Sequence, residues 1–276
     1  MEKYFKFRNG RIHYTDQGSG ETVMLIHGYL ETSEIWECFA GRLAENFRVL
    51  TVDIPGHGKS DICSPVLTME FIAGVLKELL AGEGIMKAFL VGHSLGGYVT
   101  LAFAEIYCEM LSGYCLFHSH PLADTPETIE KRKQEINLVE AGRKDLVYPG
   151  AILKMFAAPG NERFREELKR SVQIASTIPG DSIIAVLTGM MERPSRLSVM
   201  ERGIVPCLWI LGAMDNYIDC NAIRTKVKLP ASAEIVILKN SGHLGFIEEE
   251  DLSLEVLSEF IKGRVISQGN QWHTSE

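Results

Sequence analysis

Long apolar runs and strongly basic stretches are both missing from this chain of 276 residues. A membrane-spanning helix needs about 20 apolar residues, so we expect no membrane partner. The formal net charge of −8 argues against a nucleic-acid partner. The first residues alternate charged and aromatic side chains without the apolar core of a signal peptide. The six cysteines show no paired spacing, so we expect reduced thiols and a cytoplasmic protein.

Repeats and low-complexity linkers are also missing, and strand and helix patterns alternate along the chain. A hydrophobic content of 46% suffices for the core of one α/β domain. The alternation breaks after an apolar strand that ends at Phe117, and only helical periodicity follows, with Thr125 and Pro126 at the first helix start. We predict a core from residues 1–118 and 204–262, a helical cap over 119–203 and a C-terminal tail over 263–276.

A serine lies between glycines in the segment LVGHSLGG, residues 90–97. A continuous apolar run precedes it, as expected of a strand buried on both faces of a parallel sheet, and a helical pattern follows. Glycine at positions 92 and 96 removes side chains that would clash in so tight a turn. The N-terminus of the following helix favours negative charge at the serine. We predict that Ser94 is a nucleophile; the alternative is a structural glycine-rich turn.

Two later strands are each followed by a residue that a serine nucleophile requires. An apolar strand over residues 206–212 precedes Asp215, and another over 234–239 precedes His243. We predict that His243 takes the hydroxyl proton of Ser94 and that Asp215 orients the imidazole and stabilises its charged form. The alternatives are a loop or helix-capping carboxylate at Asp215 and a surface histidine at His243. Asp124 is a further candidate for the acid, although Asp215 fits the common place better.

The negative charge that forms on a substrate oxygen requires preorganised hydrogen-bond donors. One predicted donor is the backbone N–H of Leu95, directly after the nucleophile. The second is the backbone N–H of Tyr29, in the loop after an apolar strand that ends in His-Gly. The alternative is that Gly28 only forms a turn.

These segments together resemble the α/β-hydrolase superfamily, in its esterase, lipase and cofactor-free haloperoxidase-like branch. The matching features are HGY at residues 27–29, VLTVDIPGHGKS at 49–60, the turn around Ser94, Asp215 and SGH at 241–243. Their order and spacing extend over residues 4–262. The resemblance implies an α/β-hydrolase fold with an eight-stranded, mostly parallel sheet, flanking helices and a helical cap inserted after the sixth strand. It implies no particular substrate, because this fold hosts many reactions.

The hinge of the predicted cap carries His118 and His120, with Asp124 nearby. Zinc needs at least a third ligand in a fixed array, so we predict no metal site. His118 follows the carboxyl end of a strand, so it is a candidate for a pocket wall or a substrate hydrogen bond, and the alternative is a structural hinge histidine. Met190 belongs to a set of apolar residues at helical spacing, which indicates packing within the protein as the alternative to a role in the pocket. The predicted substrate pocket comprises Gly28, Leu30, His118, Met155, Met190 and Leu244.

The predicted function is that of a serine hydrolase that cleaves a small carboxylic ester through an acyl-enzyme, without metal or organic cofactor, as a monomer or homodimer. A serine at position 94 argues against the dehalogenase and epoxide-hydrolase branches, which the resemblance associates with an aspartate there. Thioesterase, lactonase, carbon–carbon bond hydrolase and perhydrolysis activities stay open. An alternative of another class is a ligand receptor or signalling protein that keeps the triad but turns over slowly or once.

Overall fold

One eight-stranded sheet forms the centre of the computed structural model, which describes residues 1–158, 160 and 162–263. Its order is β1-β2-β4-β3-β5-β6-β7-β8. β2 pairs antiparallel with β1 and β4, and all other neighbours are parallel, which confirms the predicted sheet. Apart from Gly263, the predicted tail lies outside the described residues. The strands are β1 (Glu2–Phe7), β2 (Gly10–Gln17), β3 (Thr22–Ile26), β4 (Arg48–Val52), β5 (Ala88–His93), β6 (Leu111–Phe117), β7 (Cys207–Gly212) and β8 (Ala233–Leu238).

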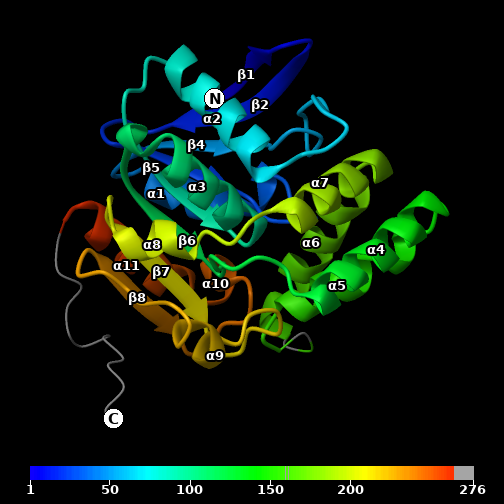
Figure 1. Ribbon diagram of the computed structural model, residues 1–276. Helices are drawn as coiled ribbons and strands as arrows, with labels where there is room; N and C mark the ends of the chain where they lie inside the picture. The colour runs from blue at the N-terminus through cyan, green and yellow to red at the C-terminus, as the bar shows by residue number, and fades with distance from the viewer. Residues whose placement is uncertain (159, 161, 264–276) are drawn as a thin grey trace.

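Helices flank both faces of the sheet (Figure 1). α1 packs against α11 on one face, and α2 packs against α3 on the other. The helices are α1 (Glu37–Leu43), α2 (Met69–Gly82), α3 (Leu95–Ile106), α4 (Pro126–Glu140), α5 (Tyr148–Met155), α6 (Arg165–Thr177), α7 (Gly180–Glu192), α8 (Leu197–Arg202), α9 (Cys220–Arg224), α10 (Gly245–Glu248) and α11 (Glu250–Ile261).

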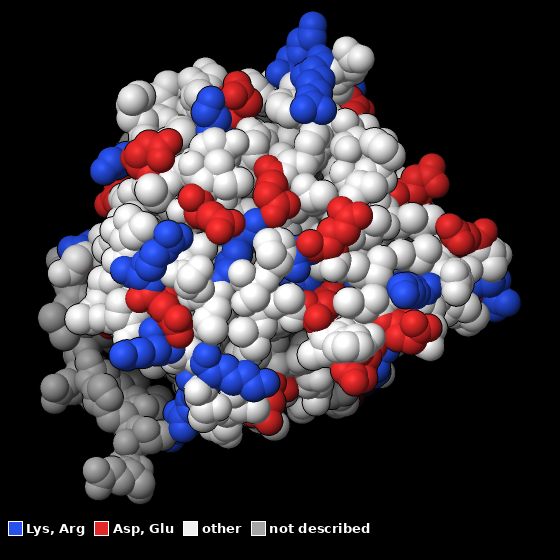
Figure 2. Space-filling model, in the orientation of Figure 1, with Lys and Arg blue, Asp and Glu red and all other residues white. Residues whose placement is uncertain are grey.

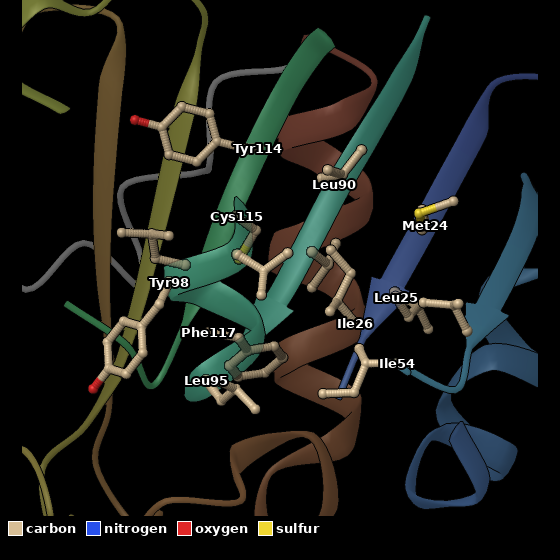
Figure 3. Packing of buried hydrophobic residues seen from close by; sticks show 14 of the residues in the cluster. Met24, Leu25, Ile26, Ile54, Leu90, Leu95, Tyr98, Tyr114, Cys115 and Phe117 are labelled. Atoms are coloured by element: carbon tan, nitrogen blue, oxygen red, sulfur yellow. The ribbon is translucent and has the colours of Figure 1, made fainter. Parts of the chain in front are cut away.

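The central strands are buried along their whole length. Every residue of β3, β5 and β7 is buried, as unbroken apolar runs predict for strands covered on both faces. The edge strand β1 instead alternates exposed and partly buried residues. Figure 3 shows side chains of β3, β5 and β6, including Ile26, Leu90 and Phe117, packed together. Because these strands are parallel, this packing holds their carboxyl ends side by side at one end of the sheet.

Among the described residues, the α-helices α4 to α8 lie in the chain between β6 and β7. In Figure 1, α4, α5, α6 and α7 gather together, whereas α8 lies beside β7 and packs on α3. The start of α4 matches its sequence signal, because the Thr125 side chain accepts from Thr128 N and Pro126 is in the first turn. The division into core and cap stays a prediction, and α8 packs with the core although it falls within residues 119–203.

Two buried arginines attach the end of this insertion to the sheet's helices. Arg193 pairs with Asp124 at 2.8 Å, and its guanidinium lies 3.8 Å from the centre of the Tyr98 ring in α3. Arg196 donates through Nε to Glu105 of the same helix at 2.9 Å. Buried and multiply bonded arginines hold few alternative geometries, so α7 joins α3 at a fixed point.

The surface mixes charges of both signs. Lys and Arg are interspersed with Asp and Glu over most of the face in Figure 2. By length and composition, no single described helix could cross a membrane. One pair of helices, Glu162–Thr177 and Gly180–Glu192, is long and apolar enough when taken together, but the two are bent by 96° relative to each other. All six cysteines are free thiols.

Candidate active site

Ser94 occupies the turn between β5 and α3 with φ 49° and ψ −111°. A positive φ is unfavourable for a residue with a side chain, so the surrounding structure must hold this turn. From residue 88 to residue 104, every residue except Ser94 is buried. A Cβ on Gly92 would lie 2.2 Å from the Gly96 oxygen, and a Cβ on Gly96 would lie 2.3 Å from a carbonyl of β3. Both positions therefore require glycine, and Ser94 alone is accessible in this segment.

Ser119 supports the same turn from the segment that follows the neighbouring strand β6. Its Oγ donates to the Ser94 carbonyl at 2.7 Å, and the Ser119 carbonyl accepts from Trp209 Nε1 at 2.8 Å. The Ser94 N–H donates to the Phe117 carbonyl at 3.0 Å. The sequence analysis did not identify Ser119, because its role arises only when β6 lies beside β5.

The two predicted N–H donors lie near this turn. Leu95 is the first residue of α3, where backbone N–H groups have no partner within the helix. The loop after β3 reaches the same place, because a Cβ on Gly28 would lie 3.2 Å from the Ser94 Cβ. Tyr29 follows directly, and Leu30 turns the chain with a φ of 61°. The structure therefore brings the loop of Tyr29 and the N-terminus of α3 together beside Ser94.

His243 and Asp215 form a hydrogen-bonded pair. His243 Nδ1 lies 2.7 Å from Asp215 Oδ2, which leaves Nε2 as the free ring nitrogen. The other Asp215 oxygen accepts the N–H groups of Tyr217 at 2.7 Å and Ile218 at 3.1 Å. Burial opposes the charge of Asp215, but His243 and the Tyr217 N–H lower its pKa to about 2. Asp215 is therefore ionised at neutral pH. Burial likewise opposes a charge on His243, but the Asp215 carboxylate outweighs it and raises the pKa of His243.

The loop that carries His243 is fixed on two sides. The His243 N–H donates to the Met155 carbonyl at the end of α5, at 2.6 Å. Glu248 accepts from Gly242 N at 2.7 Å and from Ala157 N at 2.8 Å. The His243 carbonyl lies 2.8 Å from Nε2 of His93, the residue before Ser94. The helical insertion and β5 thus both contact this loop.

Asp124, the alternative acid, has other partners. Its carboxylate accepts from Arg132 Nε at 2.7 Å and pairs with Arg193 at 2.8 Å. The carboxylate of Asp124 therefore joins α4 to the end of α7, and Asp215 is the acid that contacts His243.

His118 lies beneath Asp215 and not on a pocket wall, which corrects the predicted substrate contact. Its side chain is fully buried, Nε2 accepts from Gly245 N at 2.9 Å, and Nδ1 faces Asp215 Oδ2 at 3.7 Å. Burial lowers the pKa of His118 well below its usual value despite the nearby carboxylate, so the ring is neutral. The sequence places His118 after a strand, but the direction of its side chain follows from a φ of 46°.

His120 is engaged by protein groups on both ring nitrogens. Nε2 lies 3.1 Å from the Tyr98 hydroxyl, and Nδ1 accepts from Leu122 N at 3.2 Å. Burial lowers the pKa of His120 to about 3. Within residues 1–158, 160 and 162–263, no group of three or more His, Cys, Asp and Glu is arranged to hold a metal ion.

The predicted pocket residues separate into two sets. Leu30 and Leu244 are fully buried and belong to the core, so their predicted pocket roles are wrong. Met155 and Met190 retain 4% and 3% exposure and lie on α5 and α7 of the insertion. Gly28 lies against His93 and Ser94, where a Cβ would come within 2.8 Å of the imidazole.

The sequence analysis did not identify Tyr217, nor a role for the side chain of Tyr29. The Tyr217 ring lies 5.1 Å from the His243 ring, and its hydroxyl donates to the Ala151 carbonyl in α5 at 2.8 Å. The Tyr29 hydroxyl donates to Glu135 in α4 at 3.2 Å. These side chains therefore connect the strand-end loops to the helical insertion, and only the folded arrangement of α4 and α5 identifies them.

Comparisons with known proteins agree with this fold. A family model described as alpha/beta hydrolase fold matches residues 21–250. The chain is 26% identical to a pimeloyl-[acyl-carrier protein] methyl ester esterase from Vibrio atlanticus, over 90% of this chain and 97% of that protein. It is also 26% identical to a 2-hydroxy-6-oxononadienedioate/2-hydroxy-6-oxononatrienedioate hydrolase from Paraburkholderia phymatum, over 91% of each.

The solved structure of a thermophilic esterase from Thermogutta terrifontis, with malate bound, has a TM-score of 0.86 to this chain. It is 25% identical, and the match covers 95% of this chain and 98% of that one. The family match spans most of the chain, and these relatives carry hydrolase and esterase names. This protein is a member of the alpha/beta hydrolase family.

Proposed function

We propose that this protein is a serine hydrolase that cleaves a small carboxylic ester through an acyl-enzyme. The observation that carries the proposal is the turn at Ser94, where a strained and accessible serine stands in an otherwise buried segment. An ionised Asp215 bonded to His243 supports it, because this pair can hold a neutral imidazole with Nε2 free to accept a proton. The esterase names among the relatives point to the same bond type.

In the proposed mechanism, His243 Nε2 takes the proton from Ser94 Oγ as this oxygen attacks the ester carbonyl. The backbone N–H groups of Leu95 and Tyr29 stabilise the negative charge on the carbonyl oxygen. His243 then gives the proton to the alkoxide oxygen of the ester as the bond from this oxygen to the acyl carbon breaks, and the alcohol leaves. Water releases the acyl group from Ser94 by the same steps. Asp215 keeps the proton on Nδ1 and stabilises the imidazolium.

The substrate is proposed at the level of a small ester. One relative is named for a methyl ester and another for a hydrolase of a dienedioate, so these names do not select one bond type. Thioesterase, lactonase, carbon–carbon bond hydrolase and perhydrolysis activities stay alternatives. The mechanism requires no metal or organic cofactor. The cytoplasmic location, the absence of membrane and nucleic-acid partners and the monomeric or dimeric state stay predictions from the sequence.

A panel of aryl esters with increasing acyl length tests the proposal. We expect many turnovers per protein with the shorter esters, and covalent labelling of Ser94 by a fluorophosphonate. A tight ligand with less than one turnover would instead favour the alternative of a receptor or signalling protein. Folded protein in which the fluorophosphonate leaves Ser94 unmodified would contradict the proposed nucleophile.

The rate is expected to fall in acid because protonated His243 cannot act as a base. The Asp215 carboxylate raises the pKa of His243 above its ordinary 6.5, so the base form is lost at a higher pH than for a free histidine. We therefore expect kcat/KM to decrease as pH falls through a midpoint above 6.5. A pH–rate profile with an aryl ester measures this midpoint, and a midpoint below 6.5 would contradict the assignment.

A further inference from the structure

His93 and Glu31 form a buried pair that the proposed mechanism does not use. His93 is fully buried and Glu31 is 2% exposed. His93 Nδ1 lies 2.8 Å from Glu31 Oε2, and His93 Nε2 lies 2.8 Å from the His243 carbonyl. The same oxygen of Glu31 accepts the Gly28 N–H at 2.6 Å. One pair of side chains therefore contacts the loops after β3 and β8 at the end of β5.

These hydrogen bonds determine where the protons lie. The His243 carbonyl only accepts, so His93 Nε2 carries a hydrogen. Glu31 Oε2 accepts from Gly28 at 2.6 Å, a short distance typical of an ionised acceptor. A carboxylate has no hydrogen to donate, so His93 Nδ1 carries one as well.

The surroundings make this pair rigid. The rings of Trp36 and Phe246 lie 6.2 Å and 5.0 Å from the His93 ring, and the rings of His243 and His118 lie 5.0 Å and 6.3 Å away. Burial opposes the charge on Glu31, but His93 and the Gly28 N–H hold the pKa of that carboxyl below its usual value. Charged hydrogen bonds in a buried site are strong and directional, and removal of one partner leaves an unpaired buried charge.

We propose that the Glu31–His93 ion pair is a clamp that positions the Tyr29 N–H donor and the His243 ring relative to Ser94. Glu31 accepts a hydrogen bond from the N–H of Gly28, the residue before Tyr29. His93 bonds to the backbone carbonyl of His243. Both residues are positioning residues, because neither contacts the substrate in the mechanism. This inference rests on the proposed hydrolase function, and it adds a connection between the oxyanion donor and the general base.

Glu31→Gln tests the clamp, because the amide removes the negative charge of the shared oxygen. If the Gln oxygen takes the place of Glu31 Oε2, it accepts both N–H groups but leaves a protonated His93 without a counter-charge. If the Gln nitrogen takes this place, two hydrogen-bond donors, the amide and the Gly28 N–H, face each other. We expect kcat for an aryl ester to fall about 10- to 100-fold with KM within about 3-fold, since misplaced donors weaken the transition state more than binding. The matched control is Glu34→Gln, three residues later on an exposed side chain, with unchanged kcat and KM.

Nitrogen-15 NMR of the His93 ring, assigned by its absence in His93→Gln, measures the charge state in the wild-type protein. Two protonated ring nitrogens at neutral pH are expected. A single protonated nitrogen, or Glu31→Gln with wild-type kcat, would overturn the clamp. The NMR result holds even where Glu31→Gln does not fold. A wild-type protein that is inactive and unlabelled at Ser94 contradicts the proposed function, whereas two protonated nitrogens in that protein still support the ion pair.

Discussion

Ser94→Ala is expected to remove ester hydrolysis almost completely, with a loss of about 10⁴- to 10⁶-fold in kcat. The substitution deletes the only side-chain oxygen that the accessible turn presents, and losses of this size accompany removal of a serine nucleophile. Because His243, Asp215 and the backbone N–H groups remain, binding of an unreacted ester is expected to persist. Steady-state kinetics measures the loss of turnover, and mass spectrometry after fluorophosphonate treatment measures the loss of covalent labelling.

Ser198→Ala is the matched control for this variant. Ser198 lies exposed on α8, and the same deletion there is expected to leave both turnover and labelling of Ser94 unchanged. The melting temperature of Ser94→Ala is expected to stay close to that of the wild type, since alanine and serine meet the same strain at a positive φ. Retained turnover or labelling in folded Ser94→Ala would place the nucleophile elsewhere.

Much of this fold could be predicted because its signals are local. The apolar run before Ser94 and the helical pattern after it correspond to β5 and α3, and glycine at 92 and 96 matches contacts that exclude a side chain. Short α5 escaped separate prediction, because it spans only Tyr148–Met155 and begins beside a proline and a glycine. Local periodicity identifies such a segment as helical without fixing where it begins and ends.

The finer features of the site depend on pairs far apart in the chain. His118 was expected in the pocket because it follows β6, yet its ring turns under Asp215 and meets Gly245. Leu30 was included in the predicted pocket, yet its backbone has a positive φ and its side chain packs in the core. The Glu31–His93 pair joins positions 62 residues apart. A sequence pattern gives the order of such residues, and only tertiary packing gives their directions.

Asp215→Asn is expected to lower kcat by about 10⁴-fold while the fold and the Ser94 nucleophile remain. Asparagine keeps the shape of the side chain but removes the charge that stabilises the imidazolium, and its amide favours the wrong tautomer of His243. Removal of the carboxylate also leaves burial as the main influence on His243, so its pKa is expected to fall and the acid limb of the pH–rate profile to move to lower pH.

Asp219→Asn provides a matched control in the same loop. Asp219 is exposed and caps α9 by accepting from Asn221 N and Ala222 N, both at 3.0 Å, and asparagine caps a helix about as well as aspartate. The control is therefore expected to keep wild-type kcat and an unshifted pH profile. Asp215→Asn with kcat within about 10-fold of the wild type would show that a group other than Asp215 stabilises the His243 imidazolium. His118 cannot be this group, because it carries no negative charge, although its Nδ1 lies 3.7 Å from the Asp215 carboxylate. The acid limb of the pH–rate profile reports protonation of the His243 imidazole. Of Asp215 and Asp219, Asp215 is the one that bonds to this imidazole, so we expect the acid limb to move in Asp215→Asn and not in Asp219→Asn.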